Sequence, residues 1–364
     1  MNVTQEFEPL YRAAMALASV RGSVEAALVT ITQTQGSTFR RAGASMLVLR
    51  DGRLICELSG GCPQRDIALR AQQVMENDQP ALVAYGRNSN YDVMIETGCG
   101  GELQVLIEPL RAGDDLRFLE AVATLRASRQ RGTLVTLYAM DDAPLSPRPQ
   151  RLLRGTRDLW NDIADSALRQ LIDSELASMP FGAPASRRQV VHQGKTYDLL
   201  LESLGPPHSL VIVGDSAGAH LLAELSLQLG WETTLVDPSQ PMANLPEGAR
   251  HIIAPPSLLA SQLMLDNTTS AVVMTHRLER DIAYLGALLQ TPVSYLGVIG
   301  SRQRAAQIKA AFPQANGRLH VPAGLDIGSE TPQEIAVAIA AEILAFRSGR
   351  QGGPLSHTQR PIHP

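Results

Sequence analysis

Residues 210–219 read Leu210-Val-Ile-Val-Gly-Asp-Ser-Ala-Gly-Ala219, which predicts a short buried strand, a tight turn and the start of a helix. Dinucleotide-binding folds carry the pattern G-x-G-x-x-G/A at this place. Gly214 and Ala219 fit the first and last positions, but Ser216 fills the middle one, where a β-carbon would crowd an approaching phosphate. Asp237 ends the next strand, either as a ribose-binding acid or as a strand-end acid without a ligand. The stretch therefore predicts a Rossmann-like fold and makes NAD(P) an unfavourable ligand.

A change of pattern divides the chain at Leu204-Gly-Pro-Pro207. After it, apolar strands alternate with helical stretches, which predicts a doubly wound parallel sheet over 204–347. Before it, short strands, Gly-rich turns and helices predict a mixed α+β domain over 1–203, so that the whole chain is an α/β protein. Residues 348–364 lack periodicity and are predicted to be disordered. The expected strands are 25–32, 44–49, 53–58, 82–85, 103–108, 132–138, a hairpin over 187–201, 210–213, 233–236, 271–274 and 295–299, with helices at 63–75 and 114–128 and a loop at 141–151.

The composition excludes several classes of protein. The chain has 364 residues, of which 44% are hydrophobic and 19% charged, and its net charge is −4. Without a Lys/Arg-rich run, nucleic acid is not an expected partner. Without an apolar run of about 18 residues, no membrane partner is expected, and the acidic start Met1–Leu10 does not resemble a signal peptide. Three cysteines argue against a disulfide scaffold and favour a reducing compartment, so we expect a cytoplasmic protein.

Glycines flank two of the cysteines, in Ser59-Gly60-Gly61-Cys62 and in Thr97-Gly98-Cys99-Gly100-Gly101. Cys62 precedes Pro63 and would cap a helix, whose dipole lowers a thiol pKa. Glycine-rich turns also let backbone N–H groups gather around an anion. No Cys-x-x-Cys or nearby histidine pair supports a structural zinc site. The alternative is that each cysteine is a small buried residue in a tight turn, and Cys56, within a strand pattern, is predicted as core.

Further candidates follow predicted strands or turns. Arg40 and Arg41 follow a Gly-Ser-Thr turn, and guanidinium groups match phosphate geometry, although solvated arginines at a strand edge are the alternative. Arg302 opens a helix after the strand 295–299, which makes a natural anion site. His276 ends a strand and would serve as a ligand or as a hydrogen-bonded structural residue. Asp326 lies between two glycines and would face a ligand or bond loop amides.

The segment after Asp326 predicts a buried helix. Thr331 would be its N-cap, Pro332 its first residue and Glu334 the second half of a capping box. Apolar residues recur at helical spacing, which would bury one face. These residues are Ile335, Ile339, Ile343 and Phe346.

Together these segments resemble the XdhC/CoxI-type accessory proteins, which mature the molybdenum cofactor of xanthine dehydrogenase and related hydroxylases. The resemblance covers roughly 10–110 and 200–348, and each motif is specific only jointly with the others. It rests on Gly36–Ala44, Ser59–Cys62, Gly98–Gly101, Leu229–Trp231, Val236–Pro238, Met274–His276, Tyr295–Arg302 and Gly324–Ala336. The chain departs from the family pattern at Phe39, where proline is common, at Gln64, where glutamate is, at Ser216, where glycine is, and at Leu278, where histidine is.

The resemblance implies a chaperone that binds molybdenum cofactor, a molybdopterin in mononucleotide or dinucleotide form. The chaperone would hold it while a cysteine desulfurase supplies the terminal sulfur, and pass it to an apo molybdenum hydroxylase without catalytic turnover. A homodimer stays open. The implied cofactor-binding residues are Arg40, Arg41, Gly60, Gly61, Cys62, Cys99, Gly100, Gly101, Gly214, Asp237, His276, Arg302 and Asp326, with Cys62 and Cys99 contacting molybdenum. The alternatives are an NAD(P)-dependent oxidoreductase that uses the second domain and a divergent paralogue that acts only as an interaction module.

Overall fold

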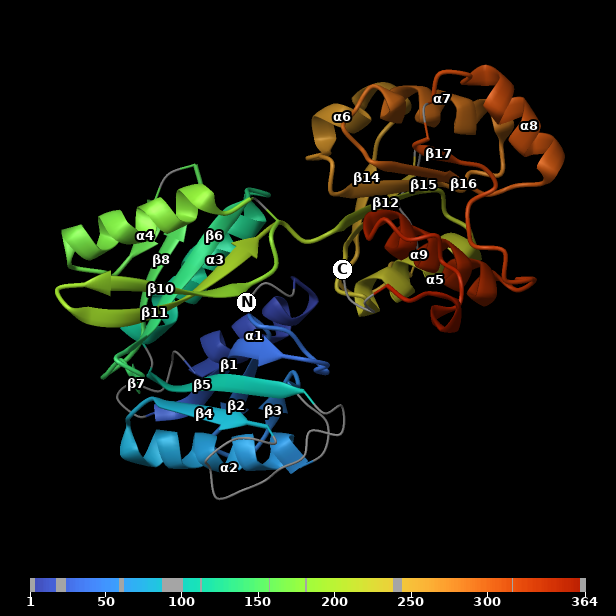
Figure 1. The fold of residues 1–364 in the computed structure, drawn as a ribbon. Coiled ribbons are helices and arrows are strands. Elements are labelled where there is room, and N and C mark those ends of the chain that lie inside the picture. The colour runs from blue at the N-terminus through green and yellow to red at the C-terminus, as the bar shows by residue number, and fades with distance from the viewer. Residues whose placement is uncertain are drawn as a thin grey trace. The chain divides into compact units, whose positions relative to one another are not determined.

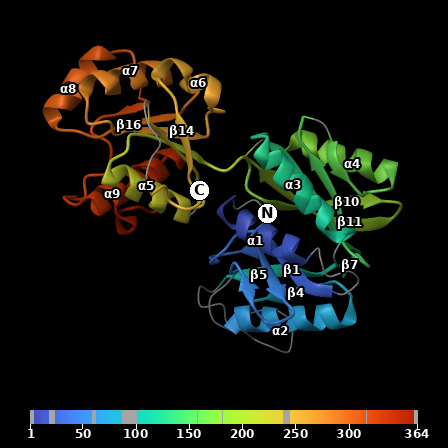
Figure 2. The ribbon, with the colours of Figure 1, turned by 180° about the vertical axis from the view of Figure 1, so that it is seen from behind.

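The computed structural model describes residues 4–17, 24–58, 62–86, 101–111, 113–156, 158–180, 182–237, 244–315 and 317–360. The chain divides into two compact units, Met1–Pro206 and Pro207–Pro364. Figures 1 and 2 show both units from opposite sides, and each is described by itself.

The first unit begins with an antiparallel sheet of order β3-β2-β1-β5-β4. Helix α2 (Cys62–Asn77) covers one face of this sheet, and α1 (Thr4–Ala16) packs on the other (Figure 1). Neighbouring residues of a strand point to opposite faces, so β1 sends Val29 towards α2 and Leu28 towards α1. The strands are β1 (Val24–Gln35), β2 (Ser45–Leu49), β3 (Leu54–Ile55), β4 (Ala81–Tyr85) and β5 (Glu102–Arg111).

A second sheet of the first unit has the order β10-β11-β6-β8-β9, with β7 paired to β6. Its hairpin turns at Gln193-Gly194, both with positive φ, as the sequence predicts. The predicted loop at 141–151 is wrong in part, because β7 and the start of β8 lie within it. The elements are η2 (Asp114–Leu116), α3 (Arg117–Ala127), β6 (Gly132–Met140), β7 (Ala143–Pro144), β8 (Gln150–Arg154), β9 (Asp158–Asn161), α4 (Ser166–Ser178), β10 (Ser186–His192) and β11 (Lys195–Leu204).

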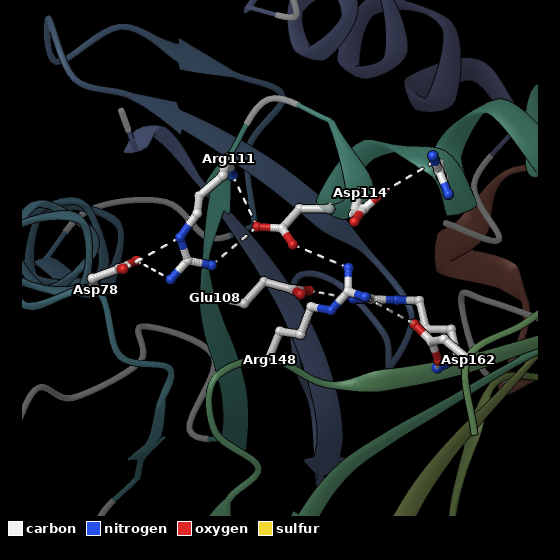
Figure 3. Close-up of polar contacts among 9 residues, drawn as sticks. Asp78, Glu108, Arg111, Asp114, Arg148 and Asp162 are labelled. Carbon is white, nitrogen blue, oxygen red and sulfur yellow. Dashed lines mark hydrogen bonds and ion pairs between the residues drawn. The ribbon is translucent and has the colours of Figure 1, made fainter. Parts of the chain in front are cut away.

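A network of ion pairs joins the two sheets of the first unit (Figure 3). Arg111, at the end of β5, pairs with Asp78 and with Asp115, and Arg148 reaches the same Asp115 at 3.0 Å. Deeper in the unit, Glu108 of β5 pairs with Arg151 of β8, and both side chains are buried. Burial raises the pKa of Glu108, and the charge of Arg151 opposes that rise. Removing one partner would leave a buried charge unpaired, so the network fixes one sheet against the other.

Within the first unit, one strand and its cysteine differ from the prediction. The expected strand 53–58 is reduced to β3, and Cys56 follows it with φ of 67°. This left-handed conformation ends the strand pairing. Cys56 is half-buried, and its thiol donates to the Glu6 carbonyl at 3.5 Å. Burial, helped by the charge of Glu6, raises the pKa of Cys56 to about 11, which keeps it a thiol at neutral pH.

The second unit is a parallel sheet of order β14-β13-β12-β15-β16-β17, which confirms the predicted Rossmann-like fold. Helices α5 and α9 cover one face, and α6, α7 and α8 cover the other (Figure 1). The elements are β12 (Ser209–Val213), α5 (Ala217–Gln228), β13 (Glu232–Asp237), β14 (Arg250–Ile253), η3 (Pro256–Leu258), α6 (Leu259–Gln262), β15 (Thr269–Val273), α7 (Leu278–Leu289), β16 (Tyr295–Val298), α8 (Arg302–Ala311), β17 (Leu319–His320), α9 (Pro332–Arg347) and η4 (Leu355–His357).

The start of α9 follows the sequence prediction in detail. Thr331 is the N-cap, Pro332 is in the first turn, and Glu334 completes the capping box. Ile339 and Ile343 are buried against the sheet. After α9, residues 351–360 are exposed, and the expected disorder of 348–364 stays a prediction.

Candidate functional site

Two glycine-containing turns, far apart in the sequence, meet at one end of the first sheet. β1 ends there and β5 begins there, because Gln35 and Glu102 are register partners. A β-carbon built on Gly101 would lie 2.0 Å from the carbonyl oxygen of Ser37, and one on Gly36 would lie 3.5 Å from the Gly101 Cα. Only glycine fits at position 101, so the turn that leads to Arg40 and Arg41 is packed on Gly101.

The start of α2 lies at the same end of the sheet. Tyr85, the last residue of β4, donates its hydroxyl proton to Asp66 in the first turns of α2 at 2.7 Å, and Arg70 donates to the same carboxylate at 2.7 Å. Burial and the bond to Asp66 raise the pKa of Tyr85, so this phenol stays a donor. Because α2 begins at Cys62, one residue before the predicted start, the backbone of Cys62 belongs to this end of the sheet.

Gln64, which replaces the glutamate common in the resembling family, bridges the turn before α2. Its side-chain oxygen accepts from the Leu58 N–H at 3.3 Å, and its amide nitrogen donates to the Met46 sulfur at 2.9 Å. A carboxylate could accept the first bond, but it has no proton for the second. The glutamine therefore fits the packing found here.

Several predicted site residues lie outside the described residues. These are Gly60, Gly61, Cys99 and Gly100, and the side chain of Cys62 is also not described. The predicted molybdenum contacts of Cys62 and Cys99 therefore stay predictions. Over the described ranges, no group of three or more His, Cys, Asp or Glu residues could hold a metal ion.

Arg40 is held by an ion pair that the sequence did not indicate. Its guanidinium contacts the Glu6 carboxylate of α1, and both side chains are largely buried, with exposed fractions of 23% and 21%. The hydroxyl of Thr38 donates to the Arg40 carbonyl at 2.8 Å, and the Ala44 N–H donates to the Arg41 carbonyl at 3.2 Å. The turn that carries both arginines is thus fixed by its own backbone, and Arg40 shares its charge with Glu6.

In the second unit, the remaining candidates follow the carboxyl ends of the parallel strands. Gly214 follows β12, Asp237 ends β13, His276 follows β15 and Arg302 opens α8 after β16. Gly214 has φ of 136°, and a β-carbon there would lie 2.6 Å from the Met274 carbonyl oxygen, so glycine is required for packing. Asp237 is buried, whereas His276 and Arg302 are exposed.

The helix start that would receive a dinucleotide phosphate is occupied by the protein itself. Ser216 is the N-cap of α5, and its hydroxyl accepts from the Ala219 N–H at 3.2 Å. Asp215 adds a negative charge beside it and bonds His220 at 2.7 Å. The sequence analysis did not pick out this Asp–His pair, although an acid in the turn and a histidine in the next helical turn were the available signal.

The other strand ends are engaged in a similar way. Arg304, in the predicted anion site at the start of α8, pairs with Asp281 of α7, whose side chain is 1% exposed. The Thr275 hydroxyl donates to the same Asp281 at 2.6 Å. This buried carboxylate was missed because sequence spacing alone does not bring α7 and α8 together.

The loop that contains Asp326 is anchored by a residue that the sequence analysis also missed. Glu342 of α9 accepts from the Gly324 N–H at 2.8 Å, from the Tyr295 hydroxyl and from His320 Nδ1 at 3.1 Å. Burial raises the pKa of Glu342, but the bonds from His320, Tyr295 and Gly324 outweigh it and leave the pKa lowered. Asp326 itself is exposed, so Glu342 fixes the loop and leaves the Asp326 side chain facing solvent.

Comparison with known proteins decides the family. The model described as the XdhC and CoxI family matches residues 19–86, and the model described as the XdhC Rossmann domain matches residues 210–343. This chain belongs to the XdhC and CoxI family. The matched ranges of this XdhC and CoxI chain include the turn at Gly36, the start of α2 and all the strand ends of the second unit, whereas Gly101 lies outside both.

Relatives extend over nearly the whole chain. A Bacillus subtilis protein, named as one probable component of a xanthine dehydrogenase, is 26% identical over 328 residues, which cover 89% of this chain and 93% of that protein. An Escherichia coli protein named molybdenum cofactor insertion chaperone PaoD is 23% identical over 353 residues, which cover 95% and 90%. A crystal structure from Bacillus halodurans, described as a xanthine dehydrogenase, shares the fold with a TM-score of 0.73 at 21% identity, covering 95% of this chain and 98% of that one. No helix in the described part of this chain is long and apolar enough to cross a membrane.

Proposed function

We propose that this XdhC and CoxI chain binds molybdenum cofactor as cargo at the end of the first sheet and delivers it to an apo molybdenum hydroxylase. The observation that carries the proposal is the contact between Ser37 and Gly101 beside the start of α2. It brings the turn of Arg40 and Arg41 to the strand that follows Cys99 in the sequence. The name of the relative from Escherichia coli, a molybdenum cofactor insertion chaperone, supports the same function.

The residues at this end of the sheet fit such a cargo in chemical type. Cys62 and Cys99 supply soft sulfur ligands, which suit a molybdenum centre or its sulfur. Cys62 starts a helix, where the dipole favours a thiolate. Arg40 and Arg41 supply positive charge for the cofactor phosphate, although Arg40 shares its charge with Glu6.

In the proposed cycle the protein holds and protects, and the cargo carries the redox chemistry of the client enzyme. Cys62 and Cys99 keep the cofactor in place while a cysteine desulfurase supplies its terminal sulfur. Release to the apo-hydroxylase then requires only that the client bind the cofactor more tightly than this chain does. No step asks this chain to turn over a substrate.

The oxidoreductase alternative is disfavoured by the start of α5. The hydroxyl of Ser216 already accepts from the Ala219 N–H, where a pyrophosphate would bind, and Asp215 repels an anion. We therefore propose that NAD(P) binds poorly and that the second unit supports delivery.

Cysteine variants test the proposal, because the chain supplies its own control. Cys62→Ala and Cys99→Ala should lower the molybdenum and pterin content of protein purified from molybdate-fed cells, with nearly unchanged melting temperatures. Cys56→Ala removes a thiol of high pKa from the same unit and should retain the cofactor. Equal cofactor content in all three variants and the parent would overturn the sulfur contacts.

A further inference from the structure

A polar cavity of about 230 Å³ opens at the same end of the first sheet. Its lining follows the strand register, in which Gln33 faces Gln104 and Gln35 faces Glu102 across β1 and β5. Residues two apart in a strand share a face, so these side chains form two adjacent rows. Such a grouping of amides and a carboxylate in a hollow is typical of a ligand site.

Small residues of β4 create the hollow. Ala84 pairs with Gln104 and ends the first row with a single methyl group. Gly86 lies under the second row, since a β-carbon there would be 2.6 Å from the Glu102 side chain. Larger residues at these positions would fill the space that the long polar side chains leave open.

Neighbouring residues fix which atoms the cavity offers. Arg187 of β10 donates to the side-chain oxygen of Gln33 at 3.0 Å, and because a guanidinium only donates, the Gln33 amide nitrogen is left as a donor. Thr32 donates to the side-chain oxygen of Gln104 at 2.9 Å, which turns that amide the same way. Within the described residues, the carboxylate of Glu102 has no hydrogen-bond or ion-pair partner. The cavity thus presents two oriented N–H donors beside a carboxylate acceptor.

We propose that this cavity binds the 2-amino-4-oxopyrimidine ring that pterins and guanine share. The ring offers adjacent N–H and NH₂ groups that match a carboxylate in two parallel bonds, here to Glu102. Its carbonyl oxygen accepts from the amides of Gln33 and Gln104. Adenine and cytosine lack the adjacent pair of donors. The volume is below the roughly 300–1,000 Å³ of pockets for larger ligands, which suits one fused ring.

The pterin source of this ring rests on the proposed function, since the molybdenum cofactor contains a pterin. A guanine nucleotide is the other source of the same chemistry. Both would place the ring within reach of the turns at Gly36 and Gly101, which adjoin the cavity at Gln35 and Glu102.

Fluorescence titration of the full-length protein with free pterin tests the site, with GMP and CMP as competitors. Pterin should bind, GMP should compete and CMP should not. Glu102→Gln keeps the shape but exchanges an acceptor for a donor, so affinity should fall roughly tenfold or more. Glu25→Gln, at the far end of β1, is the matched control and should bind as the parent does. Ala84→Leu should also abolish binding, by filling the cavity, with melting temperature as the check on folding.

Each outcome decides the question. Binding of GMP without pterin supports the ring site and assigns it to a guanine nucleotide. Equal pterin affinity in the parent and Glu102→Gln, or equal competition by CMP, overturns the site. Molybdenum content measured on the same samples separates the two proposals. Cofactor retained by Glu102→Gln at the parental level contradicts the ring site alone, and a parent that binds pterin but carries no cofactor contradicts the proposed function alone.

Discussion

Gly101→Ala should separate the two turns that define the candidate site. The new β-carbon would lie 2.0 Å from the Ser37 carbonyl oxygen, 2.6 Å from its carbon and 2.8 Å from a methyl of Thr38. Two of these atoms are backbone and cannot rotate away, so one turn has to move by about 1 Å. Overpacking of this kind costs about 1–3 kcal/mol. The rigid neighbours place Gly101→Ala at the upper end, about 3 kcal/mol of the free energy of unfolding.

Calorimetry of the full chain measures this effect directly. For a unit of roughly 200 residues, about 3 kcal/mol corresponds to a fall of about 6–12 °C in the melting temperature of the first unit. Gly205→Ala is the matched control, because no atom lies within 4 Å of its built β-carbon and its φ is not positive. It should stay within about 0.5 kcal/mol of the parent. If Gly101→Ala melted like Gly205→Ala, the packing of the two turns would be refuted.

Other predictions concern the contacts that hold the remaining candidates. Ser216→Ala should destabilise the second unit by about 1 kcal/mol in urea unfolding and Ser216→Gly by only a few tenths, since glycine is a tolerated N-cap; equal losses would contradict the capping role. A double-mutant cycle on Arg40 and Glu6 should give a coupling of about 1 kcal/mol, whereas additive effects would show that the pair contributes nothing. The lowered pKa of Glu342 means that its contribution is present above the unfolded value of 4.5 and is lost as pH falls through the folded pKa. Glu342→Gln should therefore destabilise the second unit at pH 7 and less so at low pH, and a difference independent of pH would argue against this charge.

Local signals in the sequence were sufficient for much of the second unit. The box at Thr331 and Glu334 fixes the start of α9, and the apolar strand ending at Gly214 fixes the first turn of the sheet. Both depend on residues a few positions apart, which is the range over which capping and strand patterns act. The same holds for the hairpin turn at Gln193-Gly194.

Contacts between distant residues were not predictable in this way. The Arg40 and Glu6 pair, the packing of Gly101 on Ser37 and the anchoring by Glu342 each join separate elements. Each involves residue types that are equally common on solvated surfaces, so no spacing distinguishes them. The sequence therefore indicated which turns matter, whereas the structure shows which of them meet.

The central claim, that this chain carries molybdenum cofactor at the end of the first sheet, is tested most directly by its cofactor content. Molybdenum and pterin would be quantified in full-length parent and Gly101→Ala protein, both purified from molybdate-fed cells. The account predicts equimolar cofactor in the parent and a marked loss in Gly101→Ala, which retains the second unit unchanged. A parent without molybdenum, or equal cofactor in both proteins, would contradict it.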